Sequence, residues 1–435
     1  MRGDIDVLII GSGGREHALA WKLAQSPRLK TLYCTPGNPG TAAIGKNVPI
    51  AATDVKSLVQ FAKEHRIDLT VVGPDDPLAL GIVNQFQKHG LRIFGPRQEA
   101  VRIESSKAFA KTLMQRVGIP TAPFTIYRPH QYIFALRSLK EREFPLMIKA
   151  GGLALGKGAY PCFTLQEAKD ALRDIVVERV HKDAGEEVII EEYLEGQELS
   201  FHAFCDNTNA ILAPVMQDHK YLFDGDRGLM TGGMGAFGPV PWANDPLIIL
   251  IRNTIIVPAL NELQRQKIPF TGCFYPGIVV TSDGPMALEY NARFGDPEAQ
   301  VLVRLLNSDL LEILEACVEN RLAKCLIEWR DGFAVCIVLA SAGYPGNDYR
   351  KFVPIEGVAE AEKLADVIVF HAGTVYTDRL RTSGGRVLGI TAWAPTLSQA
   401  LERAYKAAEI IRFAGKYYRT DIGAKAFVMP PLVTQ

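Results

Sequence analysis

The fold of this chain is indicated first by residues 145–163, which read PLMIKAGGLALGKGAYPCF. The stretch matches the phosphate-binding loop G-x4-G-K-[ST] until its last position, where Gly158 replaces the hydroxyl residue. Such a loop must open a helix, but residues 159–163 have the character of a strand. We therefore predict two strands joined by a long glycine-rich tip, a flap that could fold over a nucleotide and exclude water.

The segments beside this flap carry groups suited to a nucleotide. Lys149 lies on the strand that enters the flap, where its ammonium could reach phosphates. A second strand, at 187–193, ends in acidic residues, and its backbone could read an adenine edge while Glu198 accepts ribose hydroxyls. The predicted nucleotide contacts here are Lys149, Gly156, Lys157, Gly158, Glu191, Glu192, Tyr193, Leu194 and Glu198.

A third strand, at 286–291, carries a candidate metal site. Glu289 and Asn291 are two residues apart, so their side chains lie on one face of the strand. A carboxylate and an amide oxygen suit Mg²⁺, which completes its coordination with nucleotide phosphates. Arg293 follows directly, and its planar guanidinium suits a carboxylate or a phosphoryl group.

The N-terminal section has the alternating pattern of a parallel α/β sheet. An apolar strand at 5–10 leads into Gly11-Ser12-Gly13-Gly14 and then a helix, and further strands are predicted at 31–34, 69–72 and 91–94, with helices at 54–65 and 78–89. A dinucleotide fingerprint fails, because Glu16 replaces the third glycine and residues 33–37 lack the ribose-binding acid. The loop remains either an anion site at a helix N-terminus or a structural turn.

Two further sections follow. Helices near 99–117 and a helix at 164–180 accompany strands around 187–193 and 198–205, and Thr231–Ala236 forms a third glycine-rich loop beside Gln217–Lys220, suited to substrate anions. A last section opens with a strand at 334–340 and closes with a helix near 396–411. The predicted domains are 1–102, 103–328 with a flap subdomain at about 121–192, 329–425, and a tail at 426–435.

The composition argues for a soluble globular protein without a nucleic-acid or membrane partner. Lys+Arg and Asp+Glu both number 48 among 435 residues, so no net field attracts a polyanion. The seven cysteines form no C-x-x-C pair, which favours buried thiols over a zinc site. We found neither a signal-like N-terminus nor an apolar run of about 18 residues, and therefore expect a cytoplasmic protein.

The flap, the Glu-Glu-Tyr-Leu hinge and the Glu-x-Asn strand resemble the ATP-grasp superfamily. Within it the chain closely resembles the phosphoribosylamine–glycine ligase family, in register from about residue 5 to 425. The matching runs are Gly11–His17, Pro36–Asn38, Val72–Pro74, Ser106–Phe109, Gln217–Lys220, Thr231–Ala236, Arg293–Glu298, His371–Thr374 and Gly384–Val387. The chain departs from the family pattern at Gly151, which stands where the flap usually begins with Asp, at Asp75-Asp76 and at Leu229-Met230.

The resemblance implies α/β and α+β multidomain architecture: an open parallel pre-ATP-grasp domain, an ATP-grasp domain with a two-strand flap, and a small C-terminal α+β domain. It also implies ligation of glycine to 5-phosphoribosylamine with ATP and Mg²⁺ (or Mn²⁺), by a monomer or weak homo-oligomer. Catalytic roles fall to Arg293, Lys149 and Asp218, metal binding to Glu289 and Asn291, and a phosphate contact to Lys107. The implied substrate contacts are Gly13, Gly14, Arg15, Glu16, His17, Asn38, Asp75, Lys220, Gly233, Arg293 and Asp296.

Three alternatives stay open at this stage. A related ATP-grasp ligase, such as a carboxylase or formyl-transferring enzyme, would share the flap and the metal strand but not the Gln217–Lys220 and Arg293–Glu298 runs together. A nicotinamide oxidoreductase would depend on the first glycine loop. A non-catalytic nucleotide-binding regulator is disfavoured by the set Glu289, Asn291 and Arg293.

Overall fold

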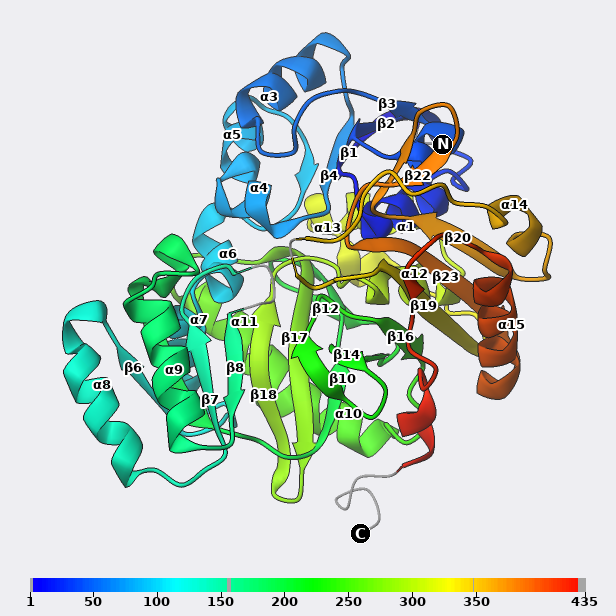
Figure 1. Ribbon diagram of the computed structural model, residues 1–435. Helices are drawn as coiled ribbons and strands as arrows, with labels where there is room; N and C mark the ends of the chain where they lie inside the picture. The colour runs from blue at the N-terminus through cyan, green and yellow to red at the C-terminus, as the bar shows by residue number, and fades with distance from the viewer. Residues whose placement is uncertain (1–2, 155–157, 347, 429–435) are drawn as a thin grey trace.

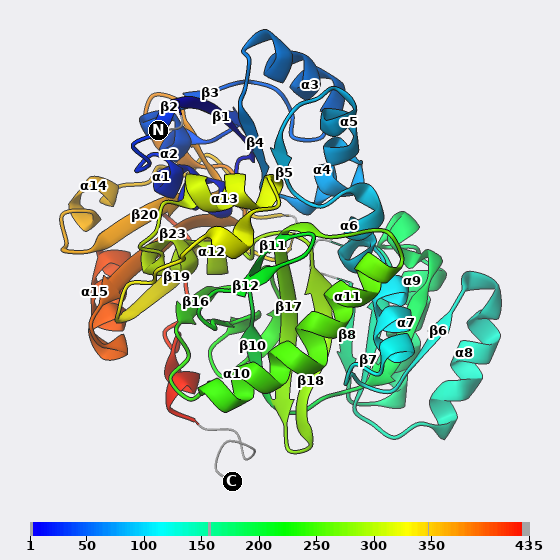
Figure 2. The same cartoon turned by 180° about the vertical axis from the view of Figure 1, so that it is seen from behind.

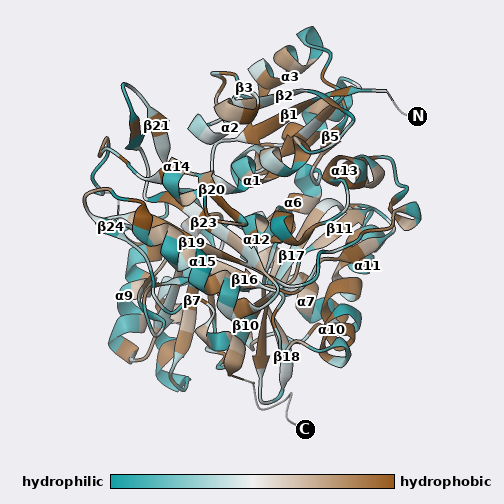
Figure 3. Cartoon of the chain, turned by 90° about the vertical axis from the view of Figure 1, so that its right-hand side faces the viewer, coloured by the Kyte–Doolittle hydropathy of each residue, from teal (hydrophilic) through white to brown (hydrophobic). Residues whose placement is uncertain are grey.

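A computed structural model describes residues 3–154, 158–346 and 348–428. Figure 1 shows the N-terminal section at the top, the flap section at the lower left and the C-terminal helix at the right. In Figure 3 the strand β1 is coloured as apolar, whereas the outer helices α9 and α15 show hydrophilic faces. The apolar residues therefore gather where the layers meet. Six of the seven cysteines are buried, as expected for core thiols.

The N-terminal section is an open parallel sheet, which confirms the prediction. The strand order is β3-β2-β1-β4-β5, and every described pairing is parallel. The strands are β1 (Ile5–Gly11), β2 (Leu29–Pro36), β3 (Lys46–Asn47), β4 (Leu69–Val72) and β5 (Ile93–Phe94), and the first helices are α1 (Gly14–Leu23), α2 (Pro39–Ile44) and α3 (Val55–Glu64). The prediction of a single helix at 78–89 was wrong. Gly81, with φ of +78°, separates α4 (Asp75–Ala79) from α5 (Ile82–Lys88).

The flap section is a four-stranded antiparallel sheet in the order β6-β9-β7-β8. It follows α6 (Gln98–Ser105) and α7 (Lys107–Val117), and it contains β6 (Phe124–Tyr127), α8 (Tyr132–Ser138), β7 (Leu146–Ala150), β8 (Ala159–Cys162), α9 (Leu165–Val176) and β9 (Val188–Glu192). Lys149 pairs with Ala159 and Leu146 with Cys162, so the predicted hairpin is confirmed. The predicted contacts Gly156 and Lys157 lie outside the described residues.

A second antiparallel sheet carries the strand that was predicted to bind a metal. Its order is β10-β17-β11-β12, and β18 (Gly284–Asn291) pairs with β17 (Thr271–Thr281). The single strand expected at 198–205 is two strands, β10 (Gln197–Ser200) and β11 (Ala203–Asp206), which pair with different stretches of β17. The remaining strand of this five-stranded sheet is β12 (Ala210–Leu212). A bulge between Gly277 and Ile278 shifts the β17–β18 register.

The third sheet crosses the predicted boundary near residue 328. Its order is β13-β16-β19-β23-β20, with β24 (Lys416–Tyr417) also on β19. The strands β19 (Phe333–Ser341), β20 (Val367–His371) and β23 (Arg386–Ala394) belong to the last section, which ends with α15 (Leu397–Ile410). The strands β13 (Gln217–Asp218) and β16 (Gly235–Gly238) come from the middle section, and β16 pairs directly with β19. Figure 2 shows α12 (Glu298–Leu305) and α13 (Leu310–Val318) between this sheet and the N-terminal section.

One helical stretch in the described part of the chain, Asp245–Arg265, is long and apolar enough to span a membrane by length and composition. It consists of α10 (Asp245–Ile251), a π-helical segment and α11 (Val257–Arg265). Its buried apolar side chains belong to the main core, and they are Leu247, Ile251, Ile255, Ile256, Ala259 and Leu263. A core helix passes the same test, so this stretch is weak evidence for a membrane span.

Candidate functional site

A cavity of about 780 Å³ lies between the flap sheet, the strands β17 and β18, and the short hairpin of β14 (Tyr221–Phe223) and β15 (Arg227–Met230). This volume is within the range of roughly 300–1,000 Å³ that is usual for small-molecule sites. The described charged residues that line it are Asp75, Glu104, Lys107, Lys111, Lys149, Glu191, Glu192, Glu195, Glu198, Asp218, Lys220, Asp226, Arg227, Glu289, Arg293, Asp296, Glu298 and Lys425. Cations from several elements thus meet carboxylates in one cleft.

Lys149 and Glu191 form a buried ion pair at the base of the flap. The second oxygen of Glu191 lies 2.5 Å from Lys111 Nζ, and Lys111 also donates to Thr121 Oγ1 at 2.7 Å. Burial opposes ionisation of Glu191, but the attraction of Lys149 and Lys111 outweighs it and lowers the pKa of Glu191. The Glu191 side chain therefore orders two lysines below the flap, a role that was not predicted for it among the nucleotide contacts.

Lys107 lies at the start of α7, close to the flap. Its ammonium donates to the carbonyl of Gly152 at 3.1 Å, and its backbone N–H donates to the carbonyl of Gly151 at 2.7 Å. Burial and the charge of Lys149 lower the pKa of Lys107, while Glu289 opposes the shift. An anion between Lys107 and Lys149 would relieve this repulsion between like charges. Gly158 lines the same side of the cavity.

The hinge after β9 forms the far wall of the cleft. Glu192, Tyr193, Leu194 and Glu198 line the cavity, and the chain leaves the sheet directly after Glu192. The neighbouring wall is apolar, with Met147, Ile189, Val279 and Leu288. An apolar wall beside a segment where the chain leaves the sheet suits a purine base. The Glu198 carboxylate lies 3.2 Å from Lys220 Nζ and so has a cationic partner in addition to the predicted ribose contact.

Glu289 and Asn291 both line the cavity from β18. Burial would raise the pKa of Glu289, but Lys220, Lys149, Lys107 and Arg293 lower it to about 2, so the carboxylate stays ionised. The Asn291 amide oxygen accepts a hydrogen bond from Arg293 at 3.2 Å. No group of three or more His, Cys, Asp or Glu side chains that could hold a metal occurs among the residues the structure describes. One carboxylate and one amide oxygen fit an ion such as Mg²⁺, which takes few protein oxygens and several from phosphates.

Arg293 is held by a carboxylate that the sequence did not reveal. Its guanidinium lies 3.0 Å from Glu104 Oε1, and the second oxygen of Glu104 accepts from the Ala292 N–H at 2.7 Å. Burial opposes the charge of Arg293, but Glu104 and Asp75 outweigh it and raise the pKa of Arg293. The guanidinium is thus fixed beside the metal strand.

Asp218, at the end of β13, and Lys220, just after it, enter the cavity from the segment before the β14–β15 hairpin. Lys220 Nζ lies 3.7 Å from Glu289 Oε1, which links it to the metal strand. Burial opposes the charge of Lys220, but Glu198 and Glu289 raise its pKa well above the usual value. Burial and the carboxylate of Glu298 raise the pKa of Asp218. Asp218 is therefore suited to accept and hold a proton.

The predicted contacts of the first glycine loop lie outside this cavity and have structural partners. The Gly13 N–H donates to Glu16 Oε2 at 2.6 Å, and Arg15 Nε donates to the other oxygen of Glu16 at 2.6 Å. His17 Nδ1 accepts from the backbone N–H of His371, and Asn38 donates to the carbonyls of Ser12 and His371. Glu16 thus satisfies one donor that an anion would otherwise use, and a role in binding substrate stays a prediction for these residues and for Gly14.

Asp296 connects the loop to the main cavity, which it lines together with the predicted contacts Asp75, Lys220 and Arg293. Its Oδ2 lies 3.7 Å from the position that a Cβ on Gly13 would occupy. Arg386, from β23, donates to Asp296 Oδ2 at 3.1 Å and to the carbonyl of Gly232 at 2.7 Å. Residues of all three sections therefore meet at Asp296. Gly233 lies beside them, since a Cβ added to it would lie 2.8 Å from Asp218 Oδ1.

Sequence reasoning missed Lys111, Glu104, Glu298 and Arg386 as site residues. Lys111 stands four residues after Lys107, one helical turn on, and this spacing could have indicated that it faces the same way. Glu298 and Arg386 lie in the quoted motif runs, although no role was given to them. Glu104 carries no local signal, because its partner lies 189 residues further along the chain.

A glycine-rich hairpin beside paired lysines, and a strand that presents one carboxylate and one amide to the same cleft, define an enzyme of the ATP-grasp class. Family models match all three sections: phosphoribosylglycinamide synthetase N domain at residues 5–104, its ATP-grasp (A) domain at 105–299 and its C domain at 334–425. The chain belongs to the phosphoribosylglycinamide synthetase family.

Individual relatives agree with this assignment. The phosphoribosylamine–glycine ligase of Brucella melitensis is 45% identical over 421 residues, 97% of this chain and 98% of the relative. The crystal structure of the same enzyme from Thermotoga maritima has a TM-score of 0.82 at 32% identity, covering 96% of this chain and all of the other. The biotin carboxylase domain of Hydrogenobacter thermophilus 2-oxoglutarate carboxylase has a TM-score of 0.75 at 16% identity, covering 96% and 92%, which shows a shared fold alone.

Proposed function

We propose that this cleft joins glycine to 5-phosphoribosylamine at the expense of ATP, giving glycinamide ribonucleotide, ADP and phosphate. The observation that carries the proposal is the convergence of Lys107, Lys149, Lys220 and Arg293 on Glu289 and Asn291 within one cavity. A tetra-anionic nucleotide with its metal fits that charge pattern. The full-length similarity to phosphoribosylamine–glycine ligases supports the choice of substrates.

In the first step a carboxylate oxygen of glycine attacks the γ-phosphorus, the bond to the β-phosphate oxygen breaks, and ADP leaves. Lys107 and Lys149 neutralise the phosphate oxygens, and Arg293 orients the glycine carboxylate. Glu289 and Asn291 would hold Mg²⁺, or Mn²⁺ in its place, which would neutralise phosphate charge when bound. The flap backbone around Gly158 covers the phosphates and excludes water, which would otherwise hydrolyse glycyl phosphate.

In the second step the amine of phosphoribosylamine attacks the carbonyl carbon of glycyl phosphate. The new C–N bond forms, the C–O bond to phosphate breaks, and the nitrogen loses a proton. Asp218 is the group in the cleft that accepts this proton, because its raised pKa brings it nearer to the working pH. The ribose phosphate binds toward Gly13 and Gly14, with Asp296 between the two sites.

We place the reaction in the cytoplasm, with small-molecule substrates and with the protein as a monomer or weak homo-oligomer. The direct test is product formation by purified protein with ATP, Mg²⁺, glycine and freshly prepared phosphoribosylamine. Steady-state ADP release should require both glycine and phosphoribosylamine, because the second step must consume glycyl phosphate before the next turnover. ADP release that is independent of glycine, or that responds to bicarbonate or formate instead, would refute the proposal and favour another ATP-grasp ligase.

A further inference from the structure

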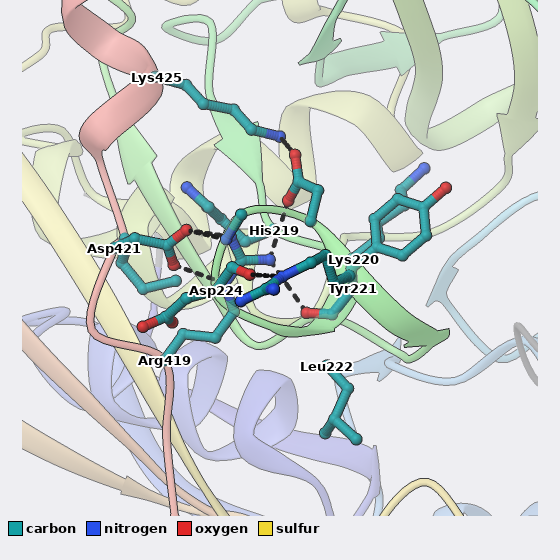
Figure 4. Close-up of polar contacts among 12 residues, drawn as sticks. His219, Lys220, Tyr221, Leu222, Asp224, Arg419, Asp421 and Lys425 are labelled. Carbon is teal, nitrogen blue, oxygen red and sulfur yellow. Dashed lines mark hydrogen bonds and ion pairs between the residues drawn. The ribbon is translucent and has the colours of Figure 1, made fainter.

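The C-terminal segment Tyr417–Lys425 crosses the outer side of the β14–β15 hairpin, and we call these nine residues the C-terminal clamp. Figure 4 shows Arg419, Asp421 and Lys425 of the clamp facing His219–Asp224. The hairpin and its flanks supply one wall of the cavity, including Lys220, Asp226 and Arg227. The clamp thus contacts the back of a wall whose front faces the nucleotide cleft.

Its hydrogen bonds reach almost every residue of the hairpin's first half. Tyr417 Oη donates to the Leu222 carbonyl at 2.9 Å, and the backbone N–H of Thr420 donates to Asp224 Oδ1 at 2.9 Å. In the reverse direction, the Gly225 N–H donates to Asp421 Oδ2 at 2.8 Å. Each pair joins residues about 195 positions apart in the chain, so none is a local turn contact.

Arg419 is the centre of this contact, and its side chain is fully buried. Two of its nitrogens form a bidentate pair with Asp421, at 2.7 Å each. A third donates to the Tyr221 carbonyl at 3.0 Å and to Asp226 Oδ1 at 2.9 Å. Only the planar fork of a guanidinium reaches all of these acceptors, and a lysine ammonium cannot.

The clamp reaches the cavity through the alternation of side chains along Asp218–Lys220, the segment that continues from the end of β13. Asp218 and Lys220 face the cavity, whereas His219 is buried on the opposite side. His219 Nε2 accepts from the Gly423 N–H at 3.3 Å, and its Nδ1 lies 3.3 Å from the Gly235 carbonyl. Contacts on the outer face therefore fix where the Lys220 ammonium lies relative to Glu198 and Glu289. Lys425 of the clamp also pairs with Asp226, and both line the cavity.

We propose that Arg419 is a positioning residue for nucleotide binding: it holds the β14–β15 hairpin so that Lys220 lies beside the metal strand, which makes the C-terminal clamp a part of the ATP site. The proposal rests on the proposed function, in that the cavity is taken to bind ATP with its metal. It adds that this C-terminal segment sets affinity for ATP although Arg419 itself does not face the cavity.

The test compares Arg419→Met and Arg419→Lys with Arg330→Met as a matched control, because Arg330 is a C-terminal guanidinium that contacts Asp366 and Trp393 instead of the hairpin. We expect both Arg419 variants to raise the KM for ATP by about tenfold or more, with a kcat change of less than about threefold. The Arg330 variant should keep the KM for ATP, even if its thermal stability falls.

Hydrogen exchange of residues 219–230, followed by mass spectrometry, gives a readout without turnover. Exchange there should become faster in Arg419→Met than in Arg330→Met, and saturating Mg-ATP should restore part of the protection. An unchanged KM for ATP with unchanged exchange in this segment would overturn the proposal and leave Arg419 a purely structural role.

If neither Arg419 variant folds, Tyr417→Phe decides, because it removes a single hydrogen bond to the hairpin. Faster exchange at 219–230 with weaker binding of Mg-ATP, measured by calorimetry, would support the proposal, and no change in either would overturn it. A wild-type protein that binds Mg-ATP without glycine-dependent ADP release would refute the proposed function alone, since the exchange and ATP-binding measurements would still test the clamp.

Discussion

Lys149 and Glu191 form a buried ion pair across two neighbouring strands, with side chains 9% and 3% exposed. Their strands β7 and β9 are antiparallel partners, and Lys149 stands opposite Ile189, two residues before Glu191. Side chains two residues apart on a strand share a face, so the diagonal pair meets below the flap. Because Lys111 also pairs with this carboxylate, a single negative charge stabilises two buried ammonium groups.

This arrangement predicts the effect of Glu191→Gln. The substitution leaves Lys111 and Lys149 without a carboxylate, and removing one partner of a buried ion pair typically costs about 3–5 kcal/mol. Thermal unfolding should show a large loss of stability without nucleotide. Mg-ATP should stabilise the variant at least as much as the wild type, since its phosphates supply the missing charge. The exposed-residue control Glu360→Gln should behave as wild type, and equal stability of both variants would contradict the prediction.

Glu289→Ala should abolish turnover while leaving the fold intact. The loss removes the one carboxylate proposed to hold the metal, and we expect a fall in kcat/KM on the order of a hundredfold or more. Steady-state ADP release measures this, with circular dichroism to check the fold. Asn291→Asp is the matched variant, because it keeps an oxygen ligand and should retain more activity. Wild-type rates in Glu289→Ala would show that the metal strand is misassigned.

Restoring the usual family residue in Gly151→Asp should weaken the protein. A Cβ at this position would lie 2.8 Å from Glu187 Cβ and 2.9 Å from the Glu187 carbonyl oxygen, too close for backbone that is hydrogen-bonded on both sides. We expect a lower melting temperature and a higher KM for ATP, because the strain lies at the base of the flap. Gly3→Asp, at an exposed position where a Cβ meets nothing within 4 Å, is the control. A Gly151→Asp protein with higher activity would mean that the segment adjusts freely.

The free energy of unfolding should fall at acid pH, because histidines that are buried in the neutral form bind a proton more readily in the unfolded state. Burial and the charge of His371 lower the pKa of His17 to about 3, below its ordinary 6.5. The unfolded state binds the proton first, so the contribution of His17 is complete above pH 6.5 and is lost as pH falls toward 3. Each such group costs about 1.4 kcal/mol per pH unit in that window.

Urea unfolding at several pH values between 7 and 4.5 tests this with His17→Asn. The Asn side chain keeps an acceptor near the His371 N–H but does not titrate. The variant should be less stable at pH 7, and its stability should fall less steeply with acid than that of the wild type. Parallel pH profiles for the two proteins would show that His17 does not titrate differently on unfolding.

Local pattern was sufficient for the flap and for the metal strand. Both predictions depend on residues that are neighbours in sequence. The stretch 145–163 departs from the phosphate-loop pattern at its last position, and Glu289 and Asn291 are two residues apart. The hairpin and the strand that these patterns predict were both confirmed. Pairings between distant segments could not be predicted from the sequence. The partner of Glu191 depends on the register of β9 against β7, and Arg419 meets its hairpin across almost half the chain. Long-range charge pairs leave no periodic trace in one sequence.

The sheet shared by β16 and β19 limits how this protein can be divided. A fragment ending near residue 328 would leave the β16 edge without its neighbour, and the complementary fragment would expose the facing edge of β19 in the same way. Unpaired strand edges recruit other chains, so each fragment alone is expected to aggregate. Mixed during refolding, the two should instead complement each other as a split enzyme, because the missing half is the best partner for either edge.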